Sequence, residues 1–408
     1  MHEDAHMKTL LTGKKILFGI TGSIAAYKAA EWVRELTKAE AEVTVVMTAA
    51  AARFVSSLTF AALSGRRVYT GMFEPDAGEE MTHISLAREC DLFIIAPATA
   101  QSIAKLACGF ADDLLSTLVL AGKAKVLVFP AMNSNMYCHA ATQANIIQLQ
   151  KYGYEVVAPE HGELACGDEG IGRLVDWKIA KESLLSAITD QDLQDQTILI
   201  TAGPTWESLD PARHLSNRSS GKMGYSLAGT AKRRGARVIL ISGPTAIDPP
   251  PGVEIVNIVS AQQMHDAVME HYSSADVVVM AAAVSDYRPG RAMVQKIKKD
   301  GKPVSLELLP NPDILKKLGQ KKKKSKRPLL IGFAAESRDH INEGKRKLTE
   351  KNLDLIVIND ILAQDTGFGA ATNQVSIMDR DYQLENMPLS SKEKCADMIW
   401  NKIVTLLH

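Results

Sequence analysis

The first half of the chain alternates short apolar, β-branched segments with longer segments of helical periodicity. The expected strands are 15–20, 42–47, 91–96, 125–130 and 154–158, and the expected helices are 24–38, 56–64, 99–108, 112–121 and 135–151. Strands that are apolar throughout and separated by helices indicate a parallel sheet covered on both faces. Residues 159–175 are rich in Gly and acidic residues and predict a long loop.

The alternation resumes after the polar segment 189–196, TDQDLQDQ, which predicts a domain junction. Strands are expected at 197–201, 236–242, 253–257, 275–281, 328–333 and 354–359, and helices at 222–234, 260–272, 338–350 and 390–406. The segment 284–327 contains Gly, Pro and eleven Lys and predicts a flexible flap. We therefore expect an α/β protein of two Rossmann-like domains, 1–190 and 191–408, with mainly parallel sheets.

The composition agrees with two globular domains and argues against nucleic acid or a membrane as a binding partner. The 408 residues exceed one hydrophobic core and suggest two domains of about 200 residues each. The chain has 47 Lys and Arg residues and 47 Asp and Glu residues. It therefore has no excess positive charge that would favour binding to nucleic acid or to an anionic membrane. The basic run 321–327 is expected to be a solvated loop. Five cysteines without a CxxC pair, and no apolar leader, predict a cytoplasmic protein without a disulfide framework or zinc site.

Two strands end in a glycine turn that leads into a helix. The first is KILFGITGSIAAYKAA at 15–30, and the second opens at 197 with a longer polar loop. Free backbone N–H groups and the helix dipole favour an anion at such a turn. A single Gly turn is equally consistent with simple chain reversal, so neither is diagnostic alone.

Small and hydroxyl residues follow several strands of the first half. Because the carboxyl ends of parallel strands meet at one sheet edge, we expect these residues to share a crevice suited to a flat cofactor with a phosphate tail. They are Gly22, Ser23, Ile24, Thr48, Thr99, Ser116 and Thr117.

Three further residues of the first half carry reactive groups. His83 lies just ahead of a strand, although a lone His is more often structural or solvated. Asn133 follows strand 125–130 directly, and helix capping is the alternative role. Cys166 lies in the Gly-rich stretch LACGDEGIGR, where a thiol on a mobile lid is expected.

The second half has a phosphate cradle of a different kind. In 216–224, SNRSSGKMG, Met223 follows Lys222, so the GxxxxGK[ST] spacing of a Walker-type ATPase is absent. Serines and glycines before a helix still suit a phosphate. Asp286 at a strand end and the i, i+4 pair Lys347 and Lys351 could extend this site, but each is also consistent with a turn, cap or solvated lysine.

Taken together, these motifs resemble the bifunctional phosphopantothenoylcysteine decarboxylase/phosphopantothenate–cysteine ligase family of coenzyme A biosynthesis. The first half matches through GSIAAYK at 22–28, HISL at 83–86, APATA at 96–100, PAMN at 130–133 and ACGD at 165–168. The second half matches through ITAGPT, SNRSSGKMG, AAVSDY, KIKK, NPDI and GFAAE, in that order. The resemblance extends from about residue 14 to residue 405 and implies a flavodoxin-like first domain.

The resemblance assigns roles to individual residues. It implies that Gly22, Ser23, Ile24, Thr48, Thr99, Ser116 and Thr117 bind FMN and that His83, Asn133 and Cys166 act in decarboxylation. It implies CTP contacts by Ala282, Asp286, Lys296, Asn311, Pro312, Asp313, Ile314, Phe333, Lys347 and Lys351. Asn217 and Lys296 would act on an acyl-cytidylate, and Asp286 would bind Mg²⁺.

The implied reactions run from the second half to the first. Phosphopantothenate would be joined to cysteine with CTP, releasing pyrophosphate and CMP, and the product would then lose CO2 to give phosphopantetheine. The resemblance also implies a homo-oligomer with trimeric decarboxylase and dimeric ligase contacts. Two alternatives remain open: a flavin-binding regulatory protein, and an NAD(P)-dependent oxidoreductase, which the absence of GxGxxG disfavours.

Overall fold

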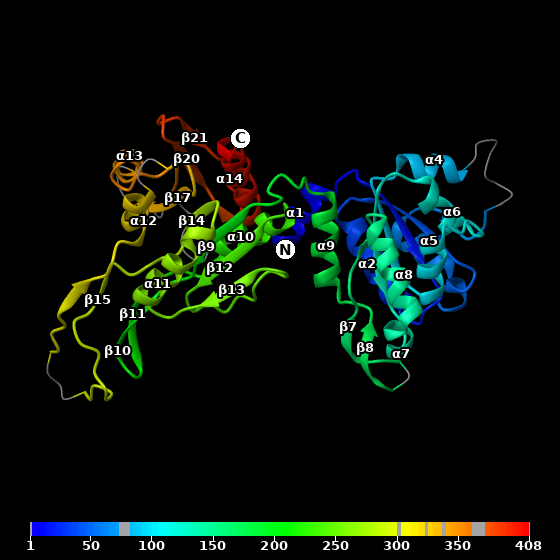
Figure 1. Cartoon of the computed structure of the whole chain (residues 1–408), viewed down its shortest axis with the longest axis horizontal. Coiled ribbons are helices and arrows are strands. Elements are labelled where there is room, and N and C mark those ends of the chain that lie inside the picture. Colours follow the sequence, from blue (N-terminus) through cyan, green and yellow to red (C-terminus); the bar gives the residue numbers. More distant parts are fainter. Residues whose placement is uncertain are drawn as a thin grey trace. The chain divides into compact units, whose positions relative to one another are not determined.

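The computed structural model describes residues 2–72, 82–165, 167–299, 303–322, 325–336, 340–360 and 372–407. By its internal contacts the chain divides into two compact units, Glu3–Thr189 and Asp190–His408 (Figure 1). Among the described helices, none is both long and apolar enough to cross a membrane.

The first unit is built on a six-stranded parallel sheet of order β3-β2-β1-β4-β5-β6. Its strands are β1 Lys15–Ile20, β2 Glu42–Met47, β3 Val68–Tyr69, β4 Leu92–Ala98, β5 Lys125–Pro130 and β6 Glu155–Val156. This is the 3-2-1-4-5-6 order of a Rossmann sheet; without the two-residue β3 it becomes the 2-1-3-4-5 order of flavodoxin. The expected α/β class is therefore confirmed.

Helices cover both faces of this sheet. They are α1 His2–Leu11, α2 Ala26–Lys38, η1 Ala51–Arg53, α3 Ser57–Ser64, α4 Thr82–Glu89, α5 Ala100–Cys108, α6 Leu114–Ala121, α7 Ser134–Cys138, α8 Ala140–Lys151 and α9 Trp177–Ile188. Because side chains alternate along a strand, Ile16 and Phe18 pack with α1, α2, α3 and α9, whereas Leu17 packs with α4, α5, α6 and α8. The expected helix 135–151 is interrupted at His139, which has extended backbone angles and caps α8.

The expectation of a loop over 159–175 is wrong. Residues Glu160–Glu163 (β7) and Glu169–Arg173 (β8) form an antiparallel hairpin. The glycines that suggested a loop permit close packing instead: a Cβ on Gly170 would lie 2.2 Å from Ser134 Oγ, and one on Gly172 2.1 Å from Met132 O. The hairpin therefore packs directly on the segment that follows β5.

The second unit contains an eight-stranded sheet of order β13-β12-β9-β14-β17-β18-β20-β21. Its strands are β9 Thr197–Ala202, β12 Arg237–Ser242, β13 Glu254–Asn257, β14 Val277–Met280, β17 Leu329–Glu336, β18 Leu355–Asp360, β20 Val375–Asp379 and β21 Leu384–Asn386. The six strands from β13 to β18 are parallel, again in Rossmann order, and β20 and β21 are antiparallel additions.

Helices also cover both faces of the second sheet. The helices are α10 Lys222–Arg233, α11 Ala261–His271, η2 Tyr272–Ser274, α12 Ile314–Lys322, α13 His340–Glu350 and α14 Lys392–Leu407. One face is covered by α10 and α14, which are joined where Trp400 Nε1 donates a 3.0 Å hydrogen bond to Leu227 O. The other face is covered by α11, α12 and α13 (Figure 1).

Three two-stranded antiparallel sheets accompany the second sheet in the described part of the chain: β10 Trp206–Asp210 with β11 Arg213–Ser216, β15 Tyr287–Pro289 with β16 Leu308–Pro310, and β19 Thr372–Asn373 with β22 Ser390–Ser391. The segment 284–327, which the sequence predicts to be a flexible flap, includes regular structure, because β15, β16 and α12 lie within it. Its flexibility stays a prediction. The basic run departs from expectation, since Lys322 is buried in an ion pair with Asp354. Lys323 and Lys324 lie outside the described residues.

Candidate functional sites

In the first unit, the turn after β1 is tied to the end of β4. Thr21, which is buried, donates a 2.7 Å hydrogen bond from Oγ1 to Pro97 O and accepts one of 3.0 Å from Thr99 N. These two strands flank the point where the strand order reverses, which is where open α/β sheets bind ligands. Thr21 was not among the expected site residues, although the GITGS motif contains it.

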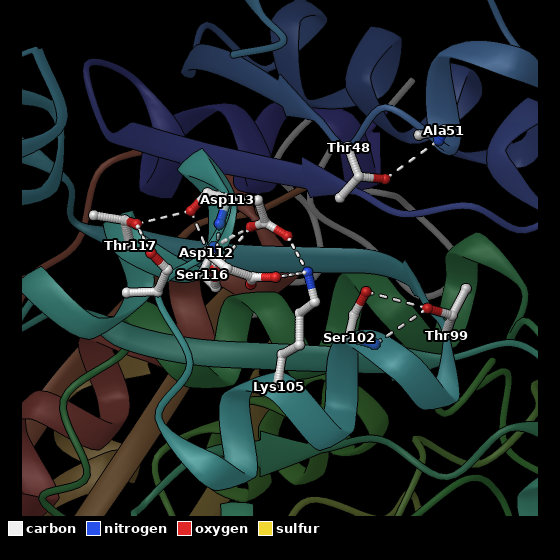
Figure 2. Close-up of polar contacts among 10 residues, drawn as sticks. Thr48, Ala51, Thr99, Ser102, Lys105, Asp112, Asp113, Ser116 and Thr117 are labelled. Atoms are coloured by element: carbon white, nitrogen blue, oxygen red, sulfur yellow. Dashed lines mark hydrogen bonds and ion pairs between the residues drawn. The ribbon is translucent and has the colours of Figure 1, made fainter. Parts of the chain in front are cut away.

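The glycine turn leaves donors available at the start of α2. A Cβ on Gly22 would lie 2.5 Å from the Cβ of Ala50, so only glycine fits here without displacement. No hydrogen bond between described residues uses the backbone N–H of Gly22 or Ile24. Thr48 lies on the adjoining loop, where its Oγ1 accepts a 3.2 Å hydrogen bond from Ala51 N (Figure 2). The turn thus offers N–H donors that suit an anionic group, and its role as a phosphate site stays a prediction.

Hydroxyl groups at the next two helix starts are engaged in capping. Thr99 caps α5, accepting from Ser102 N at 3.3 Å (Figure 2). Ser116 is buried and forms a capping box with Asp113, and Thr117 Oγ1 donates to Asp113 O at 2.8 Å. These side chains shape the crevice, and their predicted contact with FMN stays a prediction.

An ion-paired cluster supports the start of α6. Figure 2 shows the ammonium of Lys105 between Asp112 and Asp113, 2.9 Å from a carboxylate oxygen of each. Hydrogen bonds to these carboxylates raise the pKa of Lys105. Burial favours a higher pKa for Asp113, but the Ser116 N–H and Lys105 outweigh it and hold that pKa below its usual value. The cluster therefore remains ionised and anchors α6.

Asn133 caps a helix and also contacts the β7–β8 hairpin, while its role in decarboxylation stays a prediction. Its Oδ1 accepts from Asn135 N at 2.9 Å, which caps α7, and its Nδ2 donates to Asp168 Oδ2 at 3.4 Å. Met132 N also donates to Gly172 O at 3.0 Å. The structure therefore brings Asn133 together with the β7–β8 hairpin, whose tip includes Asp168.

The other two expected catalytic residues of this unit are less fully described. Cys166, two residues before Asp168, lies outside the described residues. His83 lies within α4, which precedes β4, and its side chain is likewise not described.

In the second unit, a cavity of about 510 Å³ lies at the carboxyl ends of the strands. It is lined by these expected site residues: Asn217, Ala282, Asp286, Asn311, Pro312, Asp313, Ile314, Phe333, Lys347 and Lys351. They come from five separate parts of the second unit. The tertiary structure therefore gathers nearly the whole predicted set into one site.

Two asparagines hold the segment after β14 against this cavity. Asn217 Nδ2 donates to Val284 O at 2.9 Å and to Ala283 O at 3.3 Å. From the other side, Asn311 Nδ2 donates to Ser285 O at 2.8 Å, and Asn311 N donates to Asp286 O at 2.8 Å. The backbone that carries the Asp286 carboxylate is thus held in place on both sides.

The lysines of the predicted set do not all lie in the cavity. Lys351 lines it and forms an ion pair with Asp313 at 3.0 Å. Lys296 does not line it, contrary to expectation, and is exposed on a segment that leads away from β15. That segment is held at Ile297, whose N–H donates to Asp210 Oδ2 at 3.1 Å and whose carbonyl accepts from Arg213 Nη2 at 2.8 Å.

Several lining residues were missing from the predicted set: Arg218, Ser219, Ser220, Lys222, Asn359, Asn373 and Lys392. The SNRSSGKMG motif contains the first four, so its phosphate-cradle pattern was the available signal. Lys392 and Asn373 come from the end of the chain, and no local motif marks them. Within the described ranges, no group of three His, Cys, Asp or Glu residues could hold a metal ion.

Comparison with known proteins matches both units. The flavoprotein family model matches residues 4–188, and the model of the DNA/pantothenate metabolism flavoprotein C-terminal domain matches residues 193–407. The chain is 44% identical over 399 residues to the Vibrio vulnificus (strain YJ016) coenzyme A biosynthesis bifunctional protein CoaBC, covering 97% of this chain and 99% of that protein. It is also 44% identical over 402 residues to the Bacillus subtilis (strain 168) protein of the same name, covering 97% and 98%.

Among solved structures, the crystal structure of the C-terminal domain of a coenzyme A biosynthesis bifunctional protein CoaBC is 43% identical. It covers 53% of this chain and 98% of that chain, with a TM-score of 0.46.

Proposed function

The chain belongs to the family of bifunctional coenzyme A biosynthesis proteins, and from that premise we propose that it catalyses two consecutive steps of this pathway. The second unit would join 4'-phosphopantothenate to cysteine with CTP. The first would then decarboxylate 4'-phospho-N-pantothenoylcysteine to 4'-phosphopantetheine with FMN. Membership of an enzyme family over nearly the full chain favours this function over a regulatory flavin-binding protein or an NAD(P)-dependent oxidoreductase.

For the first unit, the turn between β1 and α2 supports FMN as the cofactor. The available N–H groups of Gly22 and Ile24 suit its phosphate, and Ser23, Thr48 and Thr99 lie around the same strand ends. FMN would accept two electrons from the cysteinyl group, which makes loss of CO2 feasible, and would return them to the product after CO2 has left. The remaining FMN contacts, Ser116 and Thr117, belong to the same proposal.

The protein's own groups would handle the substrate carboxylate and protons. The Asn133 amide would hydrogen-bond the carboxylate that leaves, and His83 would orient or deprotonate the thiol end. Cys166 would return a proton after CO2 has left. The contact between Asn133 and Asp168 supports this grouping, because it sets Asn133 beside the hairpin that carries Cys166.

For the second unit, the carrying observation is the cavity that gathers Asn217, Asp286 and Lys351 from distant segments. The carboxylate of phosphopantothenate would attack the α-phosphate of CTP, displacing pyrophosphate, and the cysteine amine would then displace CMP from the acyl-cytidylate. Asn217, together with Lys296 if its segment moves toward the ligand, would bind this intermediate. Cationic side chains would offset the negative charge that develops on the phosphates.

A magnesium ion fits this site only together with the nucleotide. Asp286 offers one carboxylate to the cavity, while Asp313 is ion-paired with Lys351. Mg²⁺ typically takes one or two carboxylates and completes its shell with water and substrate phosphates. We therefore assign Asp286 as the protein ligand of a Mg²⁺ that binds with CTP.

The proposal includes a cytoplasmic location and a homo-oligomer with trimeric contacts through the first unit and dimeric contacts through the second. Small molecules are its partners, and neither nucleic acid nor a membrane is required. Size-exclusion chromatography with light scattering of the full chain tests the assembly, and a monomer at micromolar concentration would contradict it.

The decisive experiment supplies the purified chain with phosphopantothenate, cysteine, Mg²⁺ and CTP. We expect CO2, CMP, pyrophosphate and phosphopantetheine, and a yellow flavin chromophore in the protein. Omitting CTP should stop all products unless phosphopantothenoylcysteine is added, which should still release CO2. Two results would contradict the proposal: turnover that requires NAD(P)H, or a reaction in which no CTP is consumed.

A further inference from the structure

Two helices of the second unit direct their N-termini, each with a lysine as its first residue, at the cavity. Lys222 begins α10 and Lys392 begins α14, and both line the cavity wall. The helices pack against each other, with Trp400 bonded to Leu227 O. Two positive helix ends and two ammonium groups therefore meet on one side of this cavity.

This arrangement is unfavourable for the ligand-free protein. A cation at a helix N-terminus opposes the helix dipole, so lysines are normally favoured at the opposite end. Burial and the nearby charge of Lys222 together lower the pKa of Lys392. A bound anion would offset this unfavourable electrostatic energy.

No carboxylate of the described residues supplies that anion to Lys392. Glu393, in the first turn of α14, forms a 3.0 Å ion pair with Arg233. The first turn of α10 contains no acidic residue. Within the described part of the chain, no ion pair or hydrogen bond of the Lys392 ammonium is formed, whereas Lys351 across the cavity has Asp313.

We propose that Lys392, from the C-terminal helix, binds a phosphate group of the ligand in this cavity together with Lys222 and the start of α10. The proposal rests on the proposed ligase function only for the identity of that ligand. Two sources carry the required phosphate, the CTP triphosphate and the phosphomonoester of phosphopantothenate. Lys392 is thus a binding residue that lies outside the motifs of the nucleotide site.

The test uses the full chain with Lys392→Gln, and Lys394→Gln as the matched control, because Lys394 lies two residues further on the same helix and is exposed. Titration calorimetry with CTP, inorganic pyrophosphate, phosphopantothenate and cytidine compares both variants with the wild type. We expect Lys392→Gln to weaken at least one phosphate-bearing ligand roughly tenfold, the scale of one charge-assisted hydrogen bond, without affecting cytidine. Lys392→Arg should restore most of the affinity.

The pattern of loss distinguishes the sources. A loss confined to CTP and pyrophosphate assigns Lys392 to the nucleotide phosphates, and a loss confined to phosphopantothenate assigns it to the phosphomonoester. Unchanged affinity for every phosphate probe, or an equal loss in Lys394→Gln, would overturn the proposal. If the wild type binds pyrophosphate through Lys392 but does not bind CTP, the proposed ligase function fails while this inference stands.

Protein stability separates binding from a structural role. Because Lys392→Gln removes a repulsion, its ligand-free melting temperature should equal or exceed that of the wild type, while the stabilisation by ligand should shrink. A lower ligand-free melting temperature in Lys392→Gln, with no rescue of binding by Lys392→Arg, would also overturn the proposal.

Discussion

The Thr21 hydroxyl and the Pro97 carbonyl are joined by a 2.7 Å hydrogen bond in the interior of the first unit. The same hydroxyl accepts from the N–H of Thr99, the capping residue of α5. One buried side chain therefore aligns the glycine turn after β1 with the helix that follows β4. The two halves of the predicted flavin crevice depend on this contact.

Replacing Thr21 by Val preserves shape but removes the hydroxyl. The buried groups of Pro97 and Thr99 would lose a partner, and we expect a loss of about 1–3 kcal/mol in unfolding free energy together with lower flavin content. Urea denaturation and flavin absorbance measure the two effects. Thr21→Ser, which keeps the hydroxyl, should retain both properties; equal flavin content in the Val and Ser variants would contradict the predicted link.

Gly172→Ala should separate the β7–β8 hairpin from Asn133. Gly172 has a φ of +141°, and its added Cβ would lie 2.1 Å from Met132 O, so the hairpin must shift. We expect at least a roughly tenfold loss of CO2 release, on the scale of a misplaced catalytic group, with ligase turnover unchanged.

The matched control for this change lies on the same hairpin. A Cβ on Gly162 would meet its nearest neighbour, Arg173, at 3.5 Å, an ordinary contact. Gly162→Ala should therefore retain decarboxylation. If both alanine variants are equally active, the hairpin does not position the decarboxylation site.

Lys296→Gln tests whether the segment after β15 reaches the ligand during turnover. Lys296 lies outside the cavity lining, so its role requires the segment to leave its contacts with Asp210 and Arg213. We expect loss of pyrophosphate release by 100-fold or more, roughly the effect of removing one group that stabilises transition-state charge. Lys298→Gln, an exposed neighbour, is the control. Normal pyrophosphate release by Lys296→Gln would remove this residue from the site.

The pH dependence of the second unit's free energy of unfolding should include a contribution from the Asp397 carboxyl group. Burial raises the pKa of Asp397 to about 6 from its usual 3.8, although Arg233 and Arg234 oppose the shift. The folded state thus binds the proton more tightly than the unfolded state, so this contribution is fully present below about pH 4 and is lost as pH rises through 6. Asp397→Asn should be more stable at pH 8 by at most roughly 3 kcal/mol.

The measurement is the pH dependence of thermal unfolding for both proteins. The advantage of Asp397→Asn should decline between pH 8 and pH 4 as the native carboxyl becomes protonated. A difference in stability that is constant over this range would show that the substitution acts through packing or hydrogen bonding instead of titration.

Local patterns were enough to predict the two parallel sheets and most of their helices. Strands such as 15–20 and 125–130 are buried on both faces of the sheet and are therefore apolar at nearly every position. This pattern can be recognised without knowing which side chains pack against the strand. The hairpin at 159–175 was missed because its glycines resemble those of a loop. Their actual role, close approach to Met132 and Ser134, depends on a segment far away in the sequence.

The sequence by itself determined the α/β class, the two glycine turns and the motifs that indicate a family, because these depend on local periodicity and spacing. Only the tertiary structure decided which polar groups meet. It placed Asn217 on the carbonyls of Ala283 and Val284, excluded Lys296 from the cavity lining and brought Lys392 beside Lys222. Such contacts join elements that lie far apart in the sequence. Lys222 and Lys392, for example, are separated by 170 positions. No local pattern encodes that distance.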